Sequence, residues 1–270
     1  MNDLKEIQYF LLDMDGTIYL DTTLFDGTLD FLRTLKQQGK KVGYITNNSS
    51  KSIEAYVKKL ADLGISAVPE EFCTSAQSLV YNLSKTAPAS KIFLLGTPSL
   101  EEYMESSGFQ LVKKYDTSPE KRPDFVVLAF DTTLTYQKLA DACHYITEGI
   151  SYWATHPDKV CPHTKTFSLP DAGAIIECIR AATDGKIPSF IAGKPSPYMI
   201  TMFMEQQRAL PHQVAVVGDR LNTDILAAKN AGVTSVCVLS GETSRSDIER
   251  SQIKPDYVLD SIRDLYEIIK

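Results

Sequence analysis

The stretch IQYFLLDMDGTIYL, residues 7–20, runs a short apolar segment directly into two carboxylates. Its first half is rich in β-branched and aromatic residues without a helical period, which predicts a strand buried on both faces of a sheet. Because side chains two apart on a strand point the same way, we expect Asp13 and Asp15 to lie together at its carboxyl end. The two charges would repel each other, and a bound cation would offset that cost. A strand that ends in a solvated turn at Asp15 and Gly16 explains these residues equally well.

The composition is that of an ordinary globular protein. The chain has 270 residues, 43% hydrophobic and 23% charged, which is enough for one large or two modest domains. A formal net charge of -6 argues against a nucleic acid or an anionic membrane as the main partner. No apolar run approaches a membrane span, the first residues lack a signal-peptide pattern, and the five cysteines are scattered without zinc spacing. These features predict a reduced, cytoplasmic protein.

Strand-like and helix-like segments alternate along the chain. A helical pattern over 27–39 is followed by a strand pattern at 41–46, and strand patterns recur near 189–193, 214–219 and 234–240. Parallel strands need long crossover connections, so this alternation predicts mostly parallel sheets covered by helices. The expected fold is therefore α/β, with ligands at the carboxyl ends of the strands.

Two further polar clusters follow predicted strands. In YITNNSSK, residues 44–51, a strand leads into a helix whose free amide groups could bind an anion near Thr46, Asn47 and Asn48. A plain helix cap by the following serines explains part of the same pattern. In IAGKPSPY, residues 191–198, Pro195 keeps Lys194 out of helical geometry at a strand-to-helix junction. Most lysines are solvated surface charges, so Lys194 alone is a weak signal.

The segment VAVVGDRLNTDILAAKNAG, residues 214–232, adds a third carboxylate at a strand end. Asp219 closes a strongly apolar strand, and Asn222 or Thr223 is expected to cap the next helix. Asp224 in the first turn of that helix could simply complement its dipole. Asp219 has no such explanation, and Mg²⁺ is the ion that prefers a few carboxylates around an octahedral site. The chain is therefore predicted to bind Mg²⁺.

In this order, DMDGT, TNN, GKP and GDRLNTD resemble the four motifs of the haloacid dehalogenase superfamily of phosphatases. The order and GKPSPY are most similar to the branch with a large α/β cap between the second and third motifs. That branch includes para-nitrophenyl phosphatases, pyridoxal-phosphate phosphatases and ribonucleotide monophosphatases. The resemblance spans nearly the whole chain. It implies a Rossmann-like, three-layer core at 1–78 and 186–270 with an inserted cap domain at 79–185.

The resemblance also implies a mechanism, in which small phosphate monoesters are hydrolysed through an aspartyl-phosphate. Asp13 would attack phosphorus, and Asp15 would protonate the leaving oxygen and then deprotonate the water that hydrolyses the intermediate. Lys194 would pair with Asp13. The phosphoryl oxygens would be bound by Thr46, Asn47, Asn48 and Lys194.

The same resemblance assigns the metal ligands. Mg²⁺ would bind the carboxylates of Asp13 and Asp219 and the backbone carbonyl of Asp15. Asp224 would orient a water molecule that the ion carries. The ion would shield the attack of one anion on another.

The cap is expected to select the substrate, because the core motifs contact only the phosphoryl group and the metal. The loop from His156 to Gly173 resembles a family segment that reads Asn-Pro-Asp and ends in a glycine-rich turn. This chain has His156 in place of the asparagine and Asp171 in place of a glycine. These two departures leave the identity of the substrate open but do not affect the expected chemistry. For any one of its residues, a surface loop without substrate contact is the better explanation. The candidates for specificity are His156, Asp158, His163 and Asp171.

Two other functions are compatible with the motifs. A phosphotransferase or phosphomutase would use the same nucleophile, and a non-catalytic sensor could bind a phosphometabolite without turning it over. The presence of Asp13, Asp15, Lys194 and Asp219 together favours the hydrolase. Its partner would be a small phosphorylated metabolite, with no nucleic acid polymer and no membrane, and relatives imply a possible homodimer through the cap.

Overall fold

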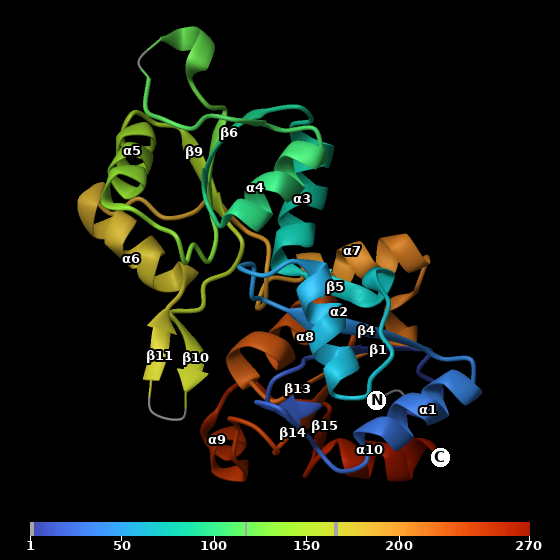
Figure 1. Cartoon of the computed structure of the whole chain (residues 1–270). Helices are drawn as coiled ribbons and strands as arrows, with labels where there is room; N and C mark the ends of the chain where they lie inside the picture. The colour runs from blue at the N-terminus through green and yellow to red at the C-terminus, as the bar shows by residue number, and fades with distance from the viewer. Residues whose placement is uncertain (1–2, 117, 165–166) are drawn as a thin grey trace. The chain divides into compact units, whose positions relative to one another are not determined.

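The chain divides into two compact units. The computed structural model describes residues 3–116, 118–164 and 167–270 (Figure 1). The first unit comprises Met1–Thr46, Ile53–Cys73 and Lys194–Lys270, and the second comprises Asn47–Ser52 and Thr74–Gly193. The short segment Asn47–Ser52, which the sequence placed in the core, therefore belongs with the second unit.

The first unit is built on a parallel sheet, which has six strands among the described residues, in the order β15-β14-β13-β1-β4-β5. Its central strand β1 (Tyr9–Leu12) pairs in parallel with β4 (Lys41–Thr46) on one side and β13 (Val214–Gly218) on the other. The register aligns Leu12 with Val217, so both strands end at the same edge. The other strands are β5 (Phe72–Thr74), β14 (Thr234–Val238) and β15 (Tyr257–Leu259).

Helices cover both faces of this sheet, because its strands are apolar on both sides. On one face Phe10 and Leu12 pack with Phe31 and Leu265 in a core that joins three helices. On the other face the ring of Tyr9 meets Phe203 edge to face, 5.9 Å between centroids. The first face carries α1 (Thr28–Gln37), α2 (Ile53–Asp62) and α10 (Ile262–Ile269), and the second carries α7 (Tyr198–Gln207). The unit also contains α8 (Leu226–Ala231), α9 (Arg245–Arg250) and a small hairpin of β2 (Tyr19–Leu20) and β3 (Thr23–Leu24).

The second unit is a separate α/β sandwich. Within the described ranges its parallel sheet has five strands in the order β12-β9-β8-β6-β7. These are β6 (Lys91–Leu95), β7 (Gln110–Leu111), β8 (Phe125–Leu128), β9 (Ser151–Ala154) and β12 (Phe190–Ile191). One face packs on α3 (Ser75–Thr86) and α4 (Pro98–Ser106), and the other on α5 (Tyr136–Thr147) and α6 (Ala172–Ala182). The predicted α/β class, a Rossmann-like core with an inserted α/β domain, is thereby confirmed.

Three local features differ from the sequence-based expectations. The expected loop at 156–173 contains an antiparallel hairpin of β10 (Val160–Thr164) and β11 (Phe167–Pro170). Its prolines are tolerated because both strands of a two-stranded ribbon are edges. Residues 189–193, expected in the core, contribute β12, which pairs with β9 in the second unit. The helix expected to start at 222 or 223 is instead preceded by one π-helical turn, Leu221–Ile225, so neither residue caps it.

The helices that the structure describes are all too short or too polar to cross a bilayer.

Candidate active site

Three carboxylates gather at the carboxyl edge of the first unit's sheet. Asp13, Asp219 and Asp224 each offer an oxygen, and these oxygens lie within 4.8 Å of one another. The parallel register brings them together: Asp13 follows β1, and its N–H donates to the carbonyl of Val217 in β13 at 2.8 Å. Asp219 and Asp224 are buried. A buried group of like charges is costly unless cations compensate it.

Among the described residues, Lys194 supplies an ammonium group that contacts two of these carboxylates. Its Nζ lies 2.6 Å from Oδ1 of Asp13 and 2.5 Å from Oδ1 of Asp224. Burial by itself lowers the pKa of Lys194, but the two carboxylates outweigh burial and hold the pKa above its usual value. The predicted pairing of Lys194 with Asp13 is present in the structure. The contact with Asp224 was not predicted, because the spacing of the two residues in the sequence does not show it.

One ammonium does not neutralise three carboxylates. Burial raises the pKa of Asp13 well above its usual range; Lys194 opposes this shift, and Asp224 and Asp219 add to it. Burial also raises the pKa of Asp219 to about 6, with a further contribution from Asp224. Residual negative charge on hard oxygen ligands is the environment that suits a divalent cation. The residues present therefore fit the predicted Mg²⁺ site.

Two glycines allow neighbouring loops to approach Asp219. A Cβ at Gly16, whose φ is +83°, would lie 2.5 Å from Oδ2 of Asp219, and a Cβ at Gly241 would lie 2.0 Å from the same atom. The N–H of Glu242 donates to Oδ2 of Asp219 at 2.8 Å. Side chains at either glycine would displace the carboxylate. The turn at Gly16 was predicted, whereas Gly241 was missed.

Asp15 lies apart from the carboxylate group. Its side chain is 62% exposed, and one oxygen lies 3.4 Å from Nζ of Lys59 in α2. The Lys59 ammonium also lies 4.0 Å from the centroid of the Tyr19 ring. Lys59 therefore contacts both the carboxylate of Asp15 and the ring of Tyr19.

The predicted phosphate-binding residues are divided between the two units. Thr46 ends β4 and, like Lys194, belongs to the first unit. Asn47 and Asn48 belong to the second unit. There, Nδ2 of Asn47 donates to Oδ2 of Asp158 at 3.0 Å, and Oδ1 of Asn48 accepts the N–H of Ser50 at 3.0 Å.

The specificity candidates have different environments. His156 and Asp171 are buried and contact each other, with Nε2 of His156 2.9 Å from Oδ1 of Asp171. Asp171 also caps α6 by accepting the N–H of Ala172. Asp158 is half-buried beside Asn47. His163 lies in β10, and its side chain is outside the part of the structure that is described. Burial argues against direct substrate contact by the side chains of His156 and Asp171.

Two family models match the chain, and they cover most of the first unit and part of the second. A haloacid dehalogenase-like hydrolase model matches residues 10–110, and a HAD-hydrolase-like model matches residues 191–265. The chain belongs to the haloacid dehalogenase-like hydrolases. This membership confirms the predicted family.

Individual relatives of this hydrolase are phosphatases. An acid sugar phosphatase of Staphylococcus aureus is 34% identical over 266 residues, 98% of each chain. The crystal structure of a 4-nitrophenylphosphatase from Thermotoga maritima is 42% identical, with a TM-score of 0.91 over 100% of both chains. A glycerol phosphate phosphatase from Mycobacterium tuberculosis, solved in complex with magnesium, is 31% identical with a TM-score of 0.89, covering 98% of this chain and 79% of that one. The predicted enzyme class, a phosphoric monoester hydrolase, is confirmed.

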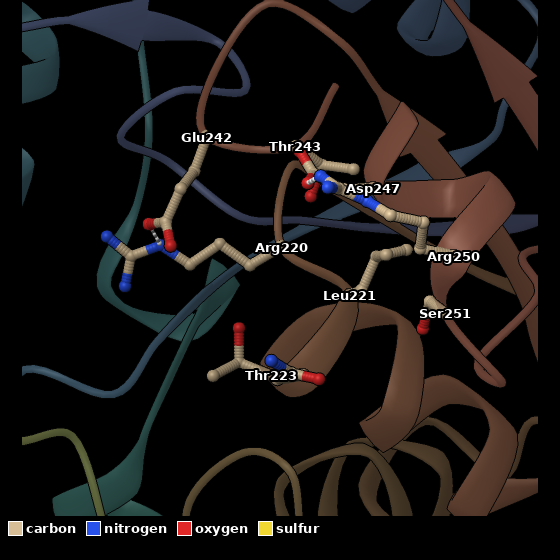
Figure 2. Close-up of a pocket in the computed structure, with 9 residues that line it drawn as sticks. Arg220, Leu221, Thr223, Glu242, Thr243, Asp247, Arg250 and Ser251 are labelled. Carbon is tan, nitrogen blue, oxygen red and sulfur yellow. Dashed lines mark hydrogen bonds and ion pairs between the residues drawn. The ribbon is translucent and has the colours of Figure 1, made fainter. Parts of the chain in front are cut away.

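The hydrolase also has a pocket of about 580 Å³ within its first unit, next to the loop of Asp219 (Figure 2). Its wall includes Arg220, whose Nε lies 2.8 Å from a carboxylate oxygen of Glu242. Glu242 is the residue whose N–H binds Asp219. Sequence reasoning missed Arg220, although its position directly after Asp219 was a signal. The other lining residues are Leu221, Asn222, Thr223, Thr243, Asp247, Arg250 and Ser251.

Proposed function

We propose that this hydrolase is a Mg²⁺-dependent phosphatase that cleaves small phosphate monoesters through an aspartyl-phosphate on Asp13. The observation that carries the proposal is the group of Asp13 and the buried Asp219 and Asp224, with Lys194 bound between Asp13 and Asp224. The relatives support the substrate class, because their names record activity on sugar phosphate, nitrophenyl phosphate and glycerol phosphate. The partner is accordingly a small phosphorylated metabolite.

Asp13 acts as the nucleophile. Lys194 binds Oδ1 and orients the carboxylate, so that Oδ2 forms the bond to phosphorus while the bond from phosphorus to the ester oxygen breaks. Asp15 gives its proton to that leaving oxygen. In the second half-reaction a water molecule attacks the phosphorus and returns a proton to Asp15, and Asp13 is released with inorganic phosphate. Two carboxylates are required because the esterified one cannot also transfer protons.

Mg²⁺ would be held by the carboxylates of Asp13 and Asp219 and the backbone carbonyl of Asp15, with Asp224 beside the site. When bound, the ion supplies positive charge that offsets the repulsion between the nucleophile and the phosphoryl oxygens. We assign binding of the phosphoryl oxygens to Thr46, Asn47, Asn48 and Lys194. The second unit, expected as a cap at 79–185, is proposed to contact the leaving group.

The test of the chemistry is a pair of substitutions assayed with 4-nitrophenyl phosphate. Asp13→Asn should abolish both turnover and the phosphoenzyme, since no carboxylate remains to attack. Asp15→Asn should slow turnover by about a hundredfold or more, the contribution of a general acid and base. Its phosphoenzyme should still form, because nitrophenolate leaves without a proton. Asp30→Asn, on the exposed face of α1, is the matched control. Wild-type turnover by Asp13→Asn would refute the proposal.

A further inference from the structure

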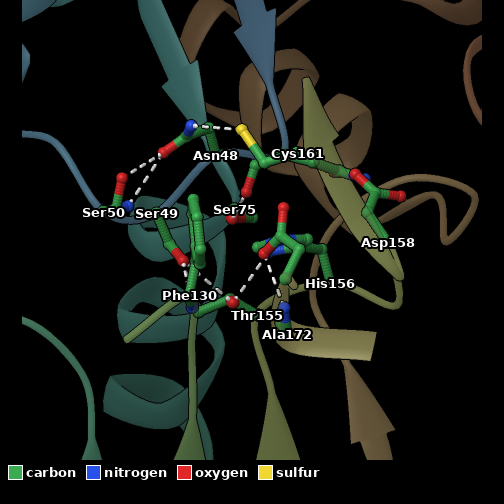
Figure 3. A network of polar contacts seen from close by, with 12 residues as sticks. Asn48, Ser49, Ser50, Ser75, Phe130, Thr155, His156, Asp158, Cys161 and Ala172 are labelled. Carbon is green, nitrogen blue, oxygen red and sulfur yellow. Dashed lines mark hydrogen bonds and ion pairs between the residues drawn. The ribbon is translucent and has the colours of Figure 1, made fainter. Parts of the chain in front are cut away.

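A chain of buried hydrogen bonds crosses the second unit (Figure 3). The hydroxyl oxygen of Ser49 accepts the N–H of Phe130 at 3.0 Å and lies 3.2 Å from the hydroxyl of Thr155. That hydroxyl lies 2.9 Å from Nδ1 of His156, and Nε2 of His156 lies 2.9 Å from Oδ1 of Asp171. Every side chain that forms these bonds is buried. We call Ser49, Thr155, His156 and Asp171 the relay.

The direction of the relay's hydrogen bonds depends on which nitrogen of His156 carries the proton. Asp171 accepts at one end, so Nε2 of His156 carries the proton that it donates. If Nδ1 of His156 carries no proton, Thr155 must donate to it, and Ser49, which accepts the N–H of Phe130, must then donate to Thr155. Each hydroxyl then donates one bond and accepts one, with the proton of His156 on Nε2. A proton on Nδ1 would reverse the bond to Thr155 and leave the Ser49 hydroxyl to find another acceptor.

The relay connects segments that are far apart in the sequence. Ser49 lies in the segment Asn47–Ser52, Phe130 follows β8, Thr155 follows β9, and Asp171 caps α6. A further hydrogen bond joins the same two segments, since Asn47 donates to Asp158, two residues beyond His156. Asn47 and Ser49, on either side of Asn48, are thus both bonded to residues 155–158.

We propose that Thr155 and His156 are positioning residues, which fix the Asn47–Ser52 segment so that it can bind the phosphoryl group. This inference rests on the proposed phosphatase function. The phosphoryl group is common to all substrates, so loss of the relay lowers the rate for every ester by the same factor. The order of substrates stays unchanged, in contrast to the specificity role expected for His156 and Asp171 from the sequence.

The first test interrupts the relay with an isosteric change. Thr155→Val removes the hydroxyl that joins Ser49 to His156, and kcat/KM should fall by about tenfold to a hundredfold for all esters, the scale for a misplaced binding group. Inhibition by inorganic phosphate should weaken in parallel. The control is Thr183→Val, which removes an equally buried hydroxyl that bonds to Ile179 at 2.7 Å in the same unit. Unchanged kcat/KM in Thr155→Val, or a changed substrate order, would overturn the proposal.

The second test separates the two nitrogens of His156. His156→Asn keeps an acceptor near the position of Nδ1 and leaves the buried carboxylate of Asp171 without its imidazole partner. His156→Gln keeps a donor near Nε2 and leaves the hydroxyl of Thr155 without an acceptor. The asparagine variant should therefore be the less stable of the two and the more active. If the asparagine variant is instead both the less stable and the less active of the two, the role of His156 is structural only.

The tautomer gives a readout that does not depend on activity. A two-bond ¹⁵N–¹H correlation spectrum of the full chain should show the imidazole of His156 with its proton on Nε2 and none on Nδ1. Protonation of Nδ1 would refute the direction of the relay. Failure of the relay proposal is distinguishable from failure of the proposed phosphatase mechanism. Asp13→Asn tests the mechanism and leaves the residues of the relay unchanged in sequence.

Discussion

Asp219 should destabilise the ion-free protein at neutral pH, and Asp219→Asn should relieve this cost. Its pKa is about 6 in the folded chain, against a usual 3.8, and the difference corresponds to about 3 kcal/mol of folding free energy. Asparagine has one acceptor oxygen, whereas the carboxylate accepts bonds from both Thr17 and Glu242. We therefore expect the variant to gain about 1–3 kcal/mol at pH 7.5 in chelator.

The sign of the pH dependence follows from the raised pKa. The folded chain takes up the proton first as the pH falls through 6, so the cost of the buried charge is present above pH 6 and disappears towards pH 4. The stability difference between Asp219→Asn and the wild type should shrink accordingly over this interval. Urea unfolding at several pH values, in chelator, measures the difference.

Asp256→Asn is a control in which the change in folding stability should have the opposite sign. Burial opposes the charge of Asp256, but Lys229 and Ser235 outweigh burial and lower its pKa. Asp256→Asn should therefore destabilise the protein at pH 7.5, and its effect should fade as the pH falls through the lowered pKa.

Mg²⁺ at a hundred times its Kd should stabilise the wild type by about 2.7 kcal/mol and Asp219→Asn far less. If Asp219→Asn were no more stable than the wild type at pH 7.5 in chelator, the account of the buried carboxylates would be wrong.

Three further outcomes are expected. Lys194→Met should destabilise the ion-free protein by about 3–5 kcal/mol in urea unfolding, because two buried carboxylates lose their cation. Gly241→Ala should raise the Mg²⁺ concentration needed for half-maximal activity, since the new Cβ would lie 2.0 Å from Oδ2 of Asp219; an unchanged requirement would contradict this. Chelation should remove turnover of 4-nitrophenyl phosphate and Mg²⁺ should restore it, and full activity in excess chelator would exclude the metal assignment.

The strand ends were predictable from sequence because two local signals coincide there. Apolar runs without helical period identified β1 and β13, and charged residues directly after such runs identified Asp13 and Asp219. Parallel pairing then requires that both strands end at one edge of the sheet. The contact of these two residues with Asp224 and Lys194 depends on helix geometry and loop closure, which the spacing of residues does not reveal.

The second unit was less predictable, for physical reasons. Prolines at 162 and 170 argued against strands in 160–170, but a two-stranded ribbon leaves an N–H position free on each edge. His156 was placed in a loop because its segment is polar and interrupted by prolines. Its burial involves Asp171, which it contacts directly, and Ser49, which contacts the neighbouring Thr155, and such pairings have no local signature in the sequence.

The membership of Asn47–Ser52 in the second unit has a consequence for the way this protein can be recombined. A domain graft made of residues 74–193 would omit Ser49, leaving the N–H of Phe130 buried without the acceptor that it has here. A buried donor left without an acceptor costs about 1–3 kcal/mol. A transplant between relatives should therefore carry both segments, with the short one inserted after β4. The segment to transplant from this chain is therefore discontinuous and consists of Asn47–Ser52 together with Thr74–Gly193.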